Sequence, residues 1–258
     1  MTTIETIRRG GRLVALVQGE SVLREHLTHG SAFTQAGPGG RGGIEYIELG
    51  HDRRAVRRHL RHGGLFGNLL GDLFAGTSRT LREFLTLLKA RERGAPVVRP
   101  LAAITERIFG IFYRADLFTE EVPSRTLRQE LESGAPEDLK PLLRALVDLH
   151  RGGVDHPDLQ LDNILIPKDG SPWMVVDLDG ARLHDVLPPS ARLRSLLRLD
   201  RSYEKRFGQQ GPVGFLRRYR FLHHYMKVTG LKSSDWLDEF RAEKLRRAWH
   251  RLGWQGKS

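Results

Sequence analysis

The sequence predicts a bilobed α+β fold, with a smaller, β-rich lobe over residues 1–120 and a larger, mainly helical lobe over residues 121–258. Three observations support this prediction. Strand-like segments surround one amphipathic helix in the first half of the chain, a β-hairpin with polar residues at its ends follows at 163–177, and arginine- and leucine-rich segments of helical spacing come after it. At 258 residues and 39% hydrophobic, the chain can bury the core that such a fold requires.

A glycine-rich stretch precedes the first clear strand at 44–49. It includes Gly39, Gly40, Arg41 and Gly42. Because glycine has no side chain, backbone amides in this stretch could approach a phosphate group closely. A flexible linker explains a glycine run just as often, so the stretch is informative only together with its neighbours.

The segment 53–60 is predicted to be a strand that carries four arginines. Arg58 is the preferred phosphate-binding residue, with Arg57 second, because a guanidinium neutralises phosphate oxygens and can bind two of them at once. A basic surface strand is the simpler interpretation, and it is favoured for Arg53, Arg54 and Arg57.

The segment 78–89 has apolar residues at positions 81, 84, 85 and 88, which predicts an amphipathic helix. Glu83 lies inside this segment. It is a candidate partner for Arg58 that would fix the phosphate contact, although a solvated helix glutamate explains it almost equally well.

A further strand is predicted over 113–122, and Pro123 ends it. A hinge is expected at this point, near Glu120 and Val122. If the hairpin residues described next act on ATP, backbone groups of this hinge would hold its adenine.

The polar residues around the hairpin are the strongest functional signal. Asn163 follows Asp158 by five positions, Asp177 follows fourteen later, and apolar strands at 164–166 and 174–176 lie between them. Phosphoryl transfer requires a base for the attacking hydroxyl and oxygen ligands for Mg²⁺ beside the nucleotide phosphates. Asp158 fits the base, and Asn163 and Asp177 fit the metal ligands. Each residue alone would be read as a turn former, but the spacing and the strands together favour a phosphotransferase.

Composition limits the possible classes of protein. There are no cysteines, the start of the chain lacks the apolar region of a signal peptide, and no stretch has the length of a membrane span, so contact with a bilayer would be peripheral. The net charge of +11 predicts an anionic partner. Nucleic acid is not expected, since zinc-finger spacing and RNA-binding aromatic signatures are absent. Much of the excess charge lies in predicted helices with a basic outer face, at 192–198, 217–220 and 241–251.

Taken together, these segments resemble the lipopolysaccharide core kinases, most closely the 3-deoxy-D-manno-octulosonic acid (Kdo) kinases, over roughly residues 37–210. The resemblance rests on segments 58–65, 79–84, 113–120, 156–159 with 163–165, and 176–179. It implies a protein-kinase-like fold. It also makes the absence of a strand lysine ordinary, since members carry an arginine-rich strand followed by Gly-Gly. Departures at Leu60, Pro157 and Leu178 remove no charged catalytic group, so they bear on the substrate more than on the reaction.

The resemblance implies transfer of the ATP γ-phosphate to a hydroxyl of Kdo on a lipid A precursor or a related anionic glycolipid. The enzyme would be cytoplasmic and peripheral on the inner membrane. A heptose kinase or another small-molecule kinase of the same fold is an alternative. From a different class, a non-catalytic pseudokinase or a basic scaffold for anionic membrane or nucleic acid stays open because the strand lysine is absent. Asp179 would either assist metal binding or hold the turn.

Overall fold

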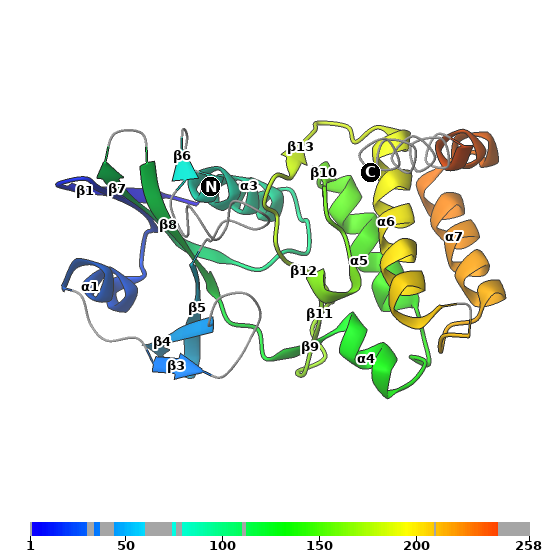
Figure 1. The fold of residues 1–258 in the computed structure, drawn as a ribbon, viewed down its shortest axis with the longest axis horizontal. Helices are drawn as coiled ribbons and strands as arrows, with labels where there is room; N and C mark the ends of the chain where they lie inside the picture. Colours follow the sequence, from blue (N-terminus) through cyan, green and yellow to red (C-terminus); the bar gives the residue numbers. More distant parts are fainter. Residues whose placement is uncertain are drawn as a thin grey trace, which may run out of the picture. The chain divides into compact units, whose positions relative to one another are not determined.

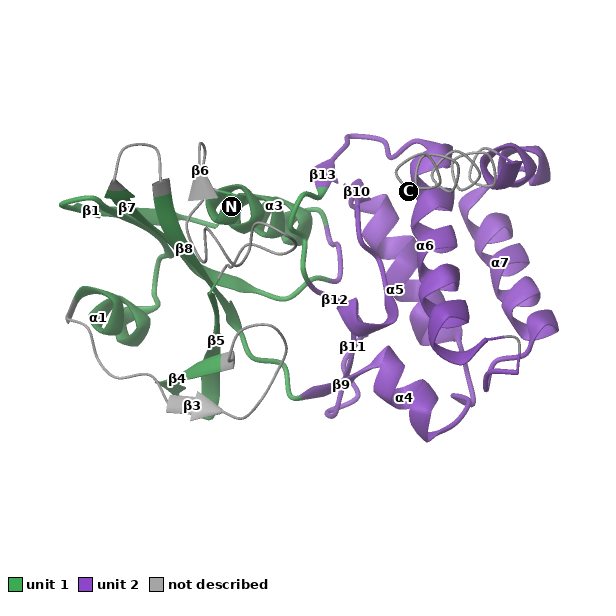
Figure 2. Ribbon diagram, in the orientation of Figure 1, with its two compact units in different colours: residues 1–93, 97–123, 177–181 green, residues 94–96, 124–176, 182–258 purple. Residues whose placement is uncertain are grey.

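A computed structural model of the chain describes residues 2–29, 34–36, 44–59, 74–75, 79–109, 112–208 and 210–241 (Figure 1). The structure is mixed α/β and divides into two compact units, which Figure 2 colours separately. Unit 1 consists of residues 1–93, 97–123 and 177–181, and unit 2 consists of residues 94–96, 124–176 and 182–258. The glycine-rich residues 39–42, the segment 60–65 and the basic segment beyond residue 241 lie outside the described residues.

An antiparallel sheet forms the body of unit 1. Its main path runs β1-β2-β7-β8-β5-β4-β3, and β6 pairs with β8. The strands are β1 (Ile4–Arg9), β2 (Arg12–Val17), β3 (Thr34–Ala36), β4 (Ile44–Gly50), β5 (Arg53–His59), β6 (Phe74–Ala75), β7 (Pro100–Phe109) and β8 (Phe112–Glu120). The predicted strands at 44–49, 53–60 and 113–122 are thus found, with ends shifted by one or two residues.

The hairpin between β4 and β5 sets the direction of the arginine-rich strand. His51 and Asp52 at its tip have φ of 52° and 57°, the left-handed values that let a tight turn match the twist of the flanking strands. β8 pairs with β5 on the other side, with Leu117 opposite Arg58. The strand that carries Arg58 is therefore held between two neighbours.

Among the described residues of unit 1, two helices cover apolar surface. On α1 (Ser21–His29), Leu23 and Leu27 are one turn apart, and both join the buried cluster formed by β2, β4, β5, β7 and β8. The predicted helix at 78–89 is α3 (Arg79–Glu92), but the predicted buried face was partly wrong. Leu85 is 38% exposed, and the buried stripe instead runs through Glu83, Phe84, Leu87 and Leu88. Glu83 can be buried there because it has a cationic partner, described below.

Unit 2 is mainly helical. Its helices are α4 (Leu127–Ser133), α5 (Lys140–Arg151), α6 (Pro189–Phe207) and α7 (Phe215–Thr229), and residues 233–241 are also helical. Short strands complete it: β9 (Ser124–Thr126), β10 (Val154–Asp155), β11 (Ile164–Pro167), β12 (Met174–Val175) and β13 (Arg182–Leu183). The predicted hairpin is confirmed, since β11 and β12 pair antiparallel with Ile164 opposite Val175. Within the described residues, no helix combines the length and apolar character needed to cross a membrane.

The basic outer face predicted for 192–198, within α6, was partly wrong. Leu193, Leu196 and Leu197 are buried as predicted, but the arginines between them are half-buried. Arg192 donates from Nε to the carbonyl oxygen of Leu187 at 3.0 Å, and Arg198 donates from Nη1 to that of His156 at 3.2 Å. These arginines satisfy loop carbonyls inside unit 2, a use that charge spacing alone cannot reveal.

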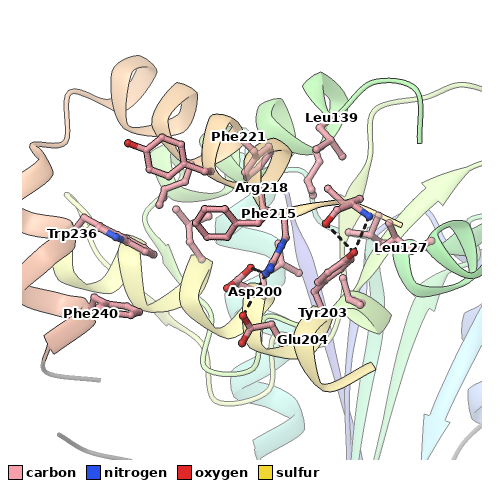
Figure 3. Close-up of a pocket in the computed structure, with 18 residues that line it drawn as sticks. Leu127, Leu139, Asp200, Tyr203, Glu204, Phe215, Arg218, Phe221, Trp236 and Phe240 are labelled. Atoms are coloured by element: carbon pink, nitrogen blue, oxygen red, sulfur yellow. Dashed lines mark hydrogen bonds and ion pairs between the residues drawn. The ribbon is translucent and has the colours of Figure 1, made fainter. Parts of the chain in front are cut away.

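An apolar pocket of about 450 Å³ lies between α4, α6, α7 and the helical segment 233–241 of unit 2 (Figure 3). Leucine and aromatic side chains form most of its wall. Arg218 lies on one side, paired with Asp200, with its guanidinium 4.9 Å from the centre of the Tyr203 ring. None of the residues predicted to take part in phosphoryl transfer lines this pocket, so the candidate active site lies elsewhere.

Candidate active site

Arg58 is the centre of a charged cluster in unit 1. Its guanidinium pairs with the carboxylate of Glu83 on α3, and its Nη1 donates to Oδ1 of Asp177 at 2.5 Å. The side chain of Arg57 binds Asp116 instead, because successive side chains of a strand point to opposite faces. Of the two candidate arginines, Arg58 is therefore the one that contacts Glu83 and Asp177. Its role in binding phosphate stays a prediction.

Glu83 is the buried member of this cluster, with its side chain only 1% exposed. Burial raises the pKa of the Glu83 carboxyl from 4.5 to about 7, and Arg58 offsets part of that effect. Partial burial works to lower the pKa of the Arg58 guanidinium, but the carboxylates of Glu83 and Asp177 outweigh it and the pKa is raised. The cluster therefore holds Arg58 charged and oriented.

Asp177 begins a short segment, 177–181, that belongs to unit 1 although the residues on both sides of it belong to unit 2. Its φ is 62°, a left-handed value that costs free energy in a residue other than glycine and that clusters at functional sites. Arg58 binds Oδ1, and among the described residues no partner meets Oδ2. Asp177 therefore presents one carboxylate oxygen that could bind a cation.

A second ion pair holds the same segment. Arg79, the first residue of α3, donates from Nη2 to Oδ2 of Asp179 at 2.5 Å and from Nε to Oδ1 at 3.3 Å. The sequence drew attention to Asp179 but not to Arg79. The spacing could have pointed to Arg79, since it lies four residues before Glu83 and hence on the same side of the predicted helix.

The loop that carries Asp158 and Asn163 lies wholly within unit 2 and is built around His156. This ring is fully buried, with Nε2 3.1 Å from the carbonyl oxygen of Val176, while Nδ1 accepts the backbone N–H of Asp158 at 3.1 Å. A nitrogen beside a carbonyl must carry the proton, so the ring is neutral and protonated on Nε2. His156 thus joins the Asp158 loop to the end of the hairpin.

Asn163 is buried and fixes the other end of this loop. Its Nδ2 donates to the carbonyl oxygen of Asp158 at 2.8 Å, and its own carbonyl accepts the backbone N–H of Val176 at 3.0 Å. Because the amide nitrogen is used in this way, the Oδ1 end is the one available as a ligand. Asp158 is exposed, and Gln160 donates from Nε2 to one of its oxygens at 3.0 Å. A base that must reach a substrate hydroxyl needs such exposure.

The predicted adenine-binding hinge lies within the described residues, and contacts inside the protein already occupy part of it. The backbone N–H of Glu120 donates to the carbonyl oxygen of Arg99 at 2.8 Å, and the Glu120 side chain is bound by Arg53. Glu120 could therefore offer adenine only its carbonyl, which leaves donation to residues such as Val122. The adenine contact stays a prediction, as does phosphate binding by residues 39–42, which lie outside the described residues.

Comparison with known proteins places these features in a family. The model of the lipopolysaccharide kinase (Kdo/WaaP) family matches residues 37–219, more than two thirds of the chain. The chain belongs to this kinase family. The resemblance read from the sequence is thereby confirmed.

Several curated relatives of this chain are named 3-deoxy-D-manno-octulosonic acid kinase, and two of them illustrate the match. The one from Vibrio cholerae serotype O1 is 33% identical over 193 residues, which cover 72% of this chain and 80% of the relative. The one from Xanthomonas oryzae pv. oryzae is 33% identical over 223 residues, which cover 83% and 87% respectively. A solved structure of WaaP in complex with acyl carrier protein shares the fold, with a TM-score of 0.55, 18% identity, and coverage of 95% of this chain and 99% of that chain.

Proposed function

We propose that this chain is an ATP-dependent kinase that phosphorylates a hydroxyl of Kdo on a lipid A precursor in lipopolysaccharide core biosynthesis. The observation that carries the proposal is membership of the Kdo/WaaP family, joined to curated Kdo kinases matched over 80% and 87% of their length. Relatives of this name favour Kdo over heptose as the acceptor. They also favour an enzyme over a non-catalytic scaffold.

In this proposal, unit 1 acts as the N-lobe and unit 2 as the C-lobe of a kinase-like fold, with the predicted boundary near residue 120. The support is the composition of the described part of each unit, which is a sheet with α1 and α3 in unit 1 and mainly helices in unit 2. Arg58, held by the buried Glu83, neutralises phosphate oxygens of ATP. The glycine-rich residues 39–42 cover those phosphates through backbone amides.

Asp158 acts as the general base in this proposal. Its exposed carboxylate accepts the proton of the Kdo hydroxyl as that oxygen bonds to the γ-phosphorus and the bond from phosphorus to the β-phosphate oxygen breaks. The fixed loop supports this role, because His156 and Asn163 both hydrogen-bond the backbone of Asp158. Positioning of this kind is the larger part of catalysis when little covalent help is needed.

Asn163 and Asp177 would supply the protein's ligands to Mg²⁺. When bound, Mg²⁺ neutralises charge on the nucleotide phosphates. An amide oxygen and a carboxylate oxygen are the hard donors that this cation prefers, and it keeps several waters besides. The oriented Asn163 amide and the Asp177 carboxylate, whose Oδ1 is held by Arg58, fit that donor set.

An assay of ATP consumption with three acceptors tests the proposed function. Purified protein with Mg²⁺ would be given a Kdo-bearing lipid A precursor, a heptose-bearing core fragment, or no acceptor. We expect turnover with the Kdo acceptor alone. Turnover with the heptose acceptor alone would assign a heptose kinase, and ATP binding without turnover on either acceptor would favour a pseudokinase.

We also propose that the enzyme is cytoplasmic and binds the inner membrane peripherally, with the exposed side of α7 as the contact. Phe215, Leu216 and Tyr219 are 69%, 67% and 57% exposed, and the exposed Arg220 follows. The helix contains no acidic residue over 215–229. Aromatic and basic side chains on one helix face suit an anionic lipid surface.

Sedimentation with lipid vesicles tests this contact. The protein is expected to bind vesicles that contain phosphatidylglycerol more strongly than phosphatidylcholine alone, and the double variant Phe215→Ser/Leu216→Ser is expected to bind weakly. Val186→Ser is the control, because Val186 is 78% exposed elsewhere in unit 2. Equal loss in the control and in the α7 variant would rule out α7 as the membrane contact.

A further inference from the structure

The two aspartates of the segment 177–181 are bound in different ways. Arg58 binds only Oδ1 of Asp177. In contrast, both oxygens of Asp179 are occupied by Arg79, with Nη2 at 2.5 Å and Nε at 3.3 Å. A guanidinium that binds both carboxylate oxygens fixes the position and the plane of that carboxylate. Asp179 is therefore held more completely than Asp177.

Arg79 is itself anchored to the sheet of unit 1. Its backbone N–H, one of the donors that the first turn of a helix leaves unpaired, donates to the hydroxyl of Tyr113 at 3.2 Å. Tyr113 lies in β8 and is only 4% exposed. The start of α3 is thus tied to a buried position, and the guanidinium of Arg79 extends from a fixed backbone.

Arg79 and Glu83 lie four residues apart, and hence on the same side of α3. Glu83 reaches the segment through Arg58, which binds Asp177. Arg79 reaches the segment directly at Asp179. One helix therefore holds both aspartates, with the fully buried Leu178 between them.

The two ion pairs of this segment could hold Asp177 in its left-handed backbone conformation, which costs free energy. Such a conformation persists only where the surroundings hold it. The contact with Arg58 holds one oxygen of the same carboxylate whose other oxygen would bind a cation, so this anchor and the metal act on a single group. The pair between Arg79 and Asp179 provides an anchor that does not involve the Asp177 carboxylate.

We propose that Arg79 and Asp179 are positioning residues, which hold the segment 177–181 against α3 so that Asp177 keeps its orientation while its carboxylate binds metal. The inference rests on the proposed function, because it takes Asp177 as the metal ligand. It also assigns Asp179, whose two oxygens are occupied by Arg79, to holding the segment rather than to metal binding.

A purely structural surface pair is the competing explanation. Arg79 and Asp179 are 48% and 28% exposed, and exposed ion pairs contribute little to stability. A surface pair would therefore leave both nucleotide binding and turnover unchanged when removed. Removal of a positioning pair would lower turnover strongly with little change in Tm, because a small misplacement of a reactive group slows the reaction.

The test compares Arg79→Asp, Asp179→Arg and the double charge-reversal variant, together with Asp179→Asn. Each single variant is expected to lower kcat/KM for ATP by on the order of tenfold to a hundredfold, and the double variant should recover part of the loss. Tm without ligands should shift by no more than about 4 °C. Arg82→Ala, an exposed arginine on the same helix, is the control and should match the wild type.

Nucleotide binding provides a readout that does not depend on turnover. The affinity for a fluorescent ATP analogue would be measured as Mg²⁺ is added, for the wild type, Asp177→Ala, Asp179→Asn and Arg79→Asp. We expect Mg²⁺ to strengthen binding to the wild type, to strengthen it less and to a similar degree in Asp179→Asn and Arg79→Asp, and not to strengthen it in Asp177→Ala. A Mg²⁺ effect that is lost in Asp179→Asn but kept in Arg79→Asp would make Asp179 a metal ligand and overturn the inference, as would wild-type kinetics in all Arg79 and Asp179 variants. An undiminished Mg²⁺ effect in Asp177→Ala would instead contradict the metal role in the proposed function.

Discussion

At the scale of single residues, Arg58 makes contacts on this strand that a lysine could not make. Arg58 meets Glu83 and Asp177 together, and its planar guanidinium can bind both at once. A lysine ammonium is a compact charge that lacks this fork. Replacing Arg58 with lysine would therefore keep the charge but lose the geometry that orients both carboxylates.

Replacement of the proposed base tests the chemistry most locally. Asp158→Asn keeps the size of the side chain and the backbone hydrogen bonds from His156 and Asn163, but removes the group that accepts a proton. We expect turnover to fall by about a hundredfold or more, with ATP affinity within about threefold of wild type. Single-turnover kinetics and equilibrium ATP binding would measure the two effects. Near-normal turnover would refute the assignment.

The sequence singled out the candidate residues but not the contacts that surround them. Spacing indicated all three candidates, because Asn163 comes directly before the first strand of the hairpin, Asp177 comes just after the second, and Asp158 lies five positions before Asn163. It could not reveal that Arg79 binds Asp179, which is 100 positions later in the chain. Long-range ion pairs depend on which elements the fold brings together, and single-sequence periodicity carries no such information.

At the scale of elements, predictions succeeded where the local pattern is sufficient. The hairpin of β11 and β12 follows from two short apolar runs and a turn between them, and the structure confirms it. The buried face of α3 and the exposed face of α6 were partly wrong, because charged residues on both helices find partners inside their own unit. Glu83 and Arg198 are examples, since their partners lie on other elements.

The packing of the end of α5 allows a test by addition of one methyl group. Gly152 caps α5, and a Cβ added there would lie 2.8 Å from Cβ of Ala95, closer than two carbon atoms can pack. We expect Gly152→Ala to lower the free energy of unfolding by about 1–3 kcal/mol. Urea denaturation of the full chain would measure the change, and hydrogen exchange of α5 would locate it.

Ala95→Gly is the matched partner for this test, because it removes the atom that an added methyl group would meet. In an Ala95→Gly background, Gly152→Ala should lower the free energy of unfolding less than in the wild type. It could even raise it, because alanine reduces the conformational entropy of the unfolded chain. Equal costs in the two backgrounds would show that the helix end is not packed on residue 95 in solution.

At the scale of the whole molecule, the least predictable feature was the unit to which each segment of the chain belongs. Segment 177–181 belongs to unit 1 while residues 124–176 and 182 onward belong to unit 2. The sequence placed Asp177 after residue 121 and thus in the second lobe. Likewise, the sequence predicted no particular element before residue 37, yet β1 and β2 extend the sheet of unit 1 beyond β7.

The elevated pKa of Glu83 makes the stability of unit 1 depend on pH. Because the pKa is about 7 in the folded chain against 4.5 ordinarily, the native state keeps a proton between these values that the unfolded state has lost. The stabilisation is therefore full below pH 4.5 and is lost as pH rises through 7, a change of about 3 kcal/mol. Glu83→Gln should lack this change. Hydrogen exchange of α3, corrected for intrinsic rates, would compare the two proteins between pH 5 and 8, and identical profiles would contradict the assigned pKa.

The most direct test of the central claim is mass spectrometry of a Kdo-bearing lipid A precursor after incubation with the protein, ATP and Mg²⁺. Asp177→Ala serves as the control, and fragmentation would locate any added group. The proposed function predicts one added phosphate on the Kdo residue with the wild type and none with the variant. An unchanged precursor in the presence of protein that binds ATP, or equal phosphorylation by both proteins, would contradict it.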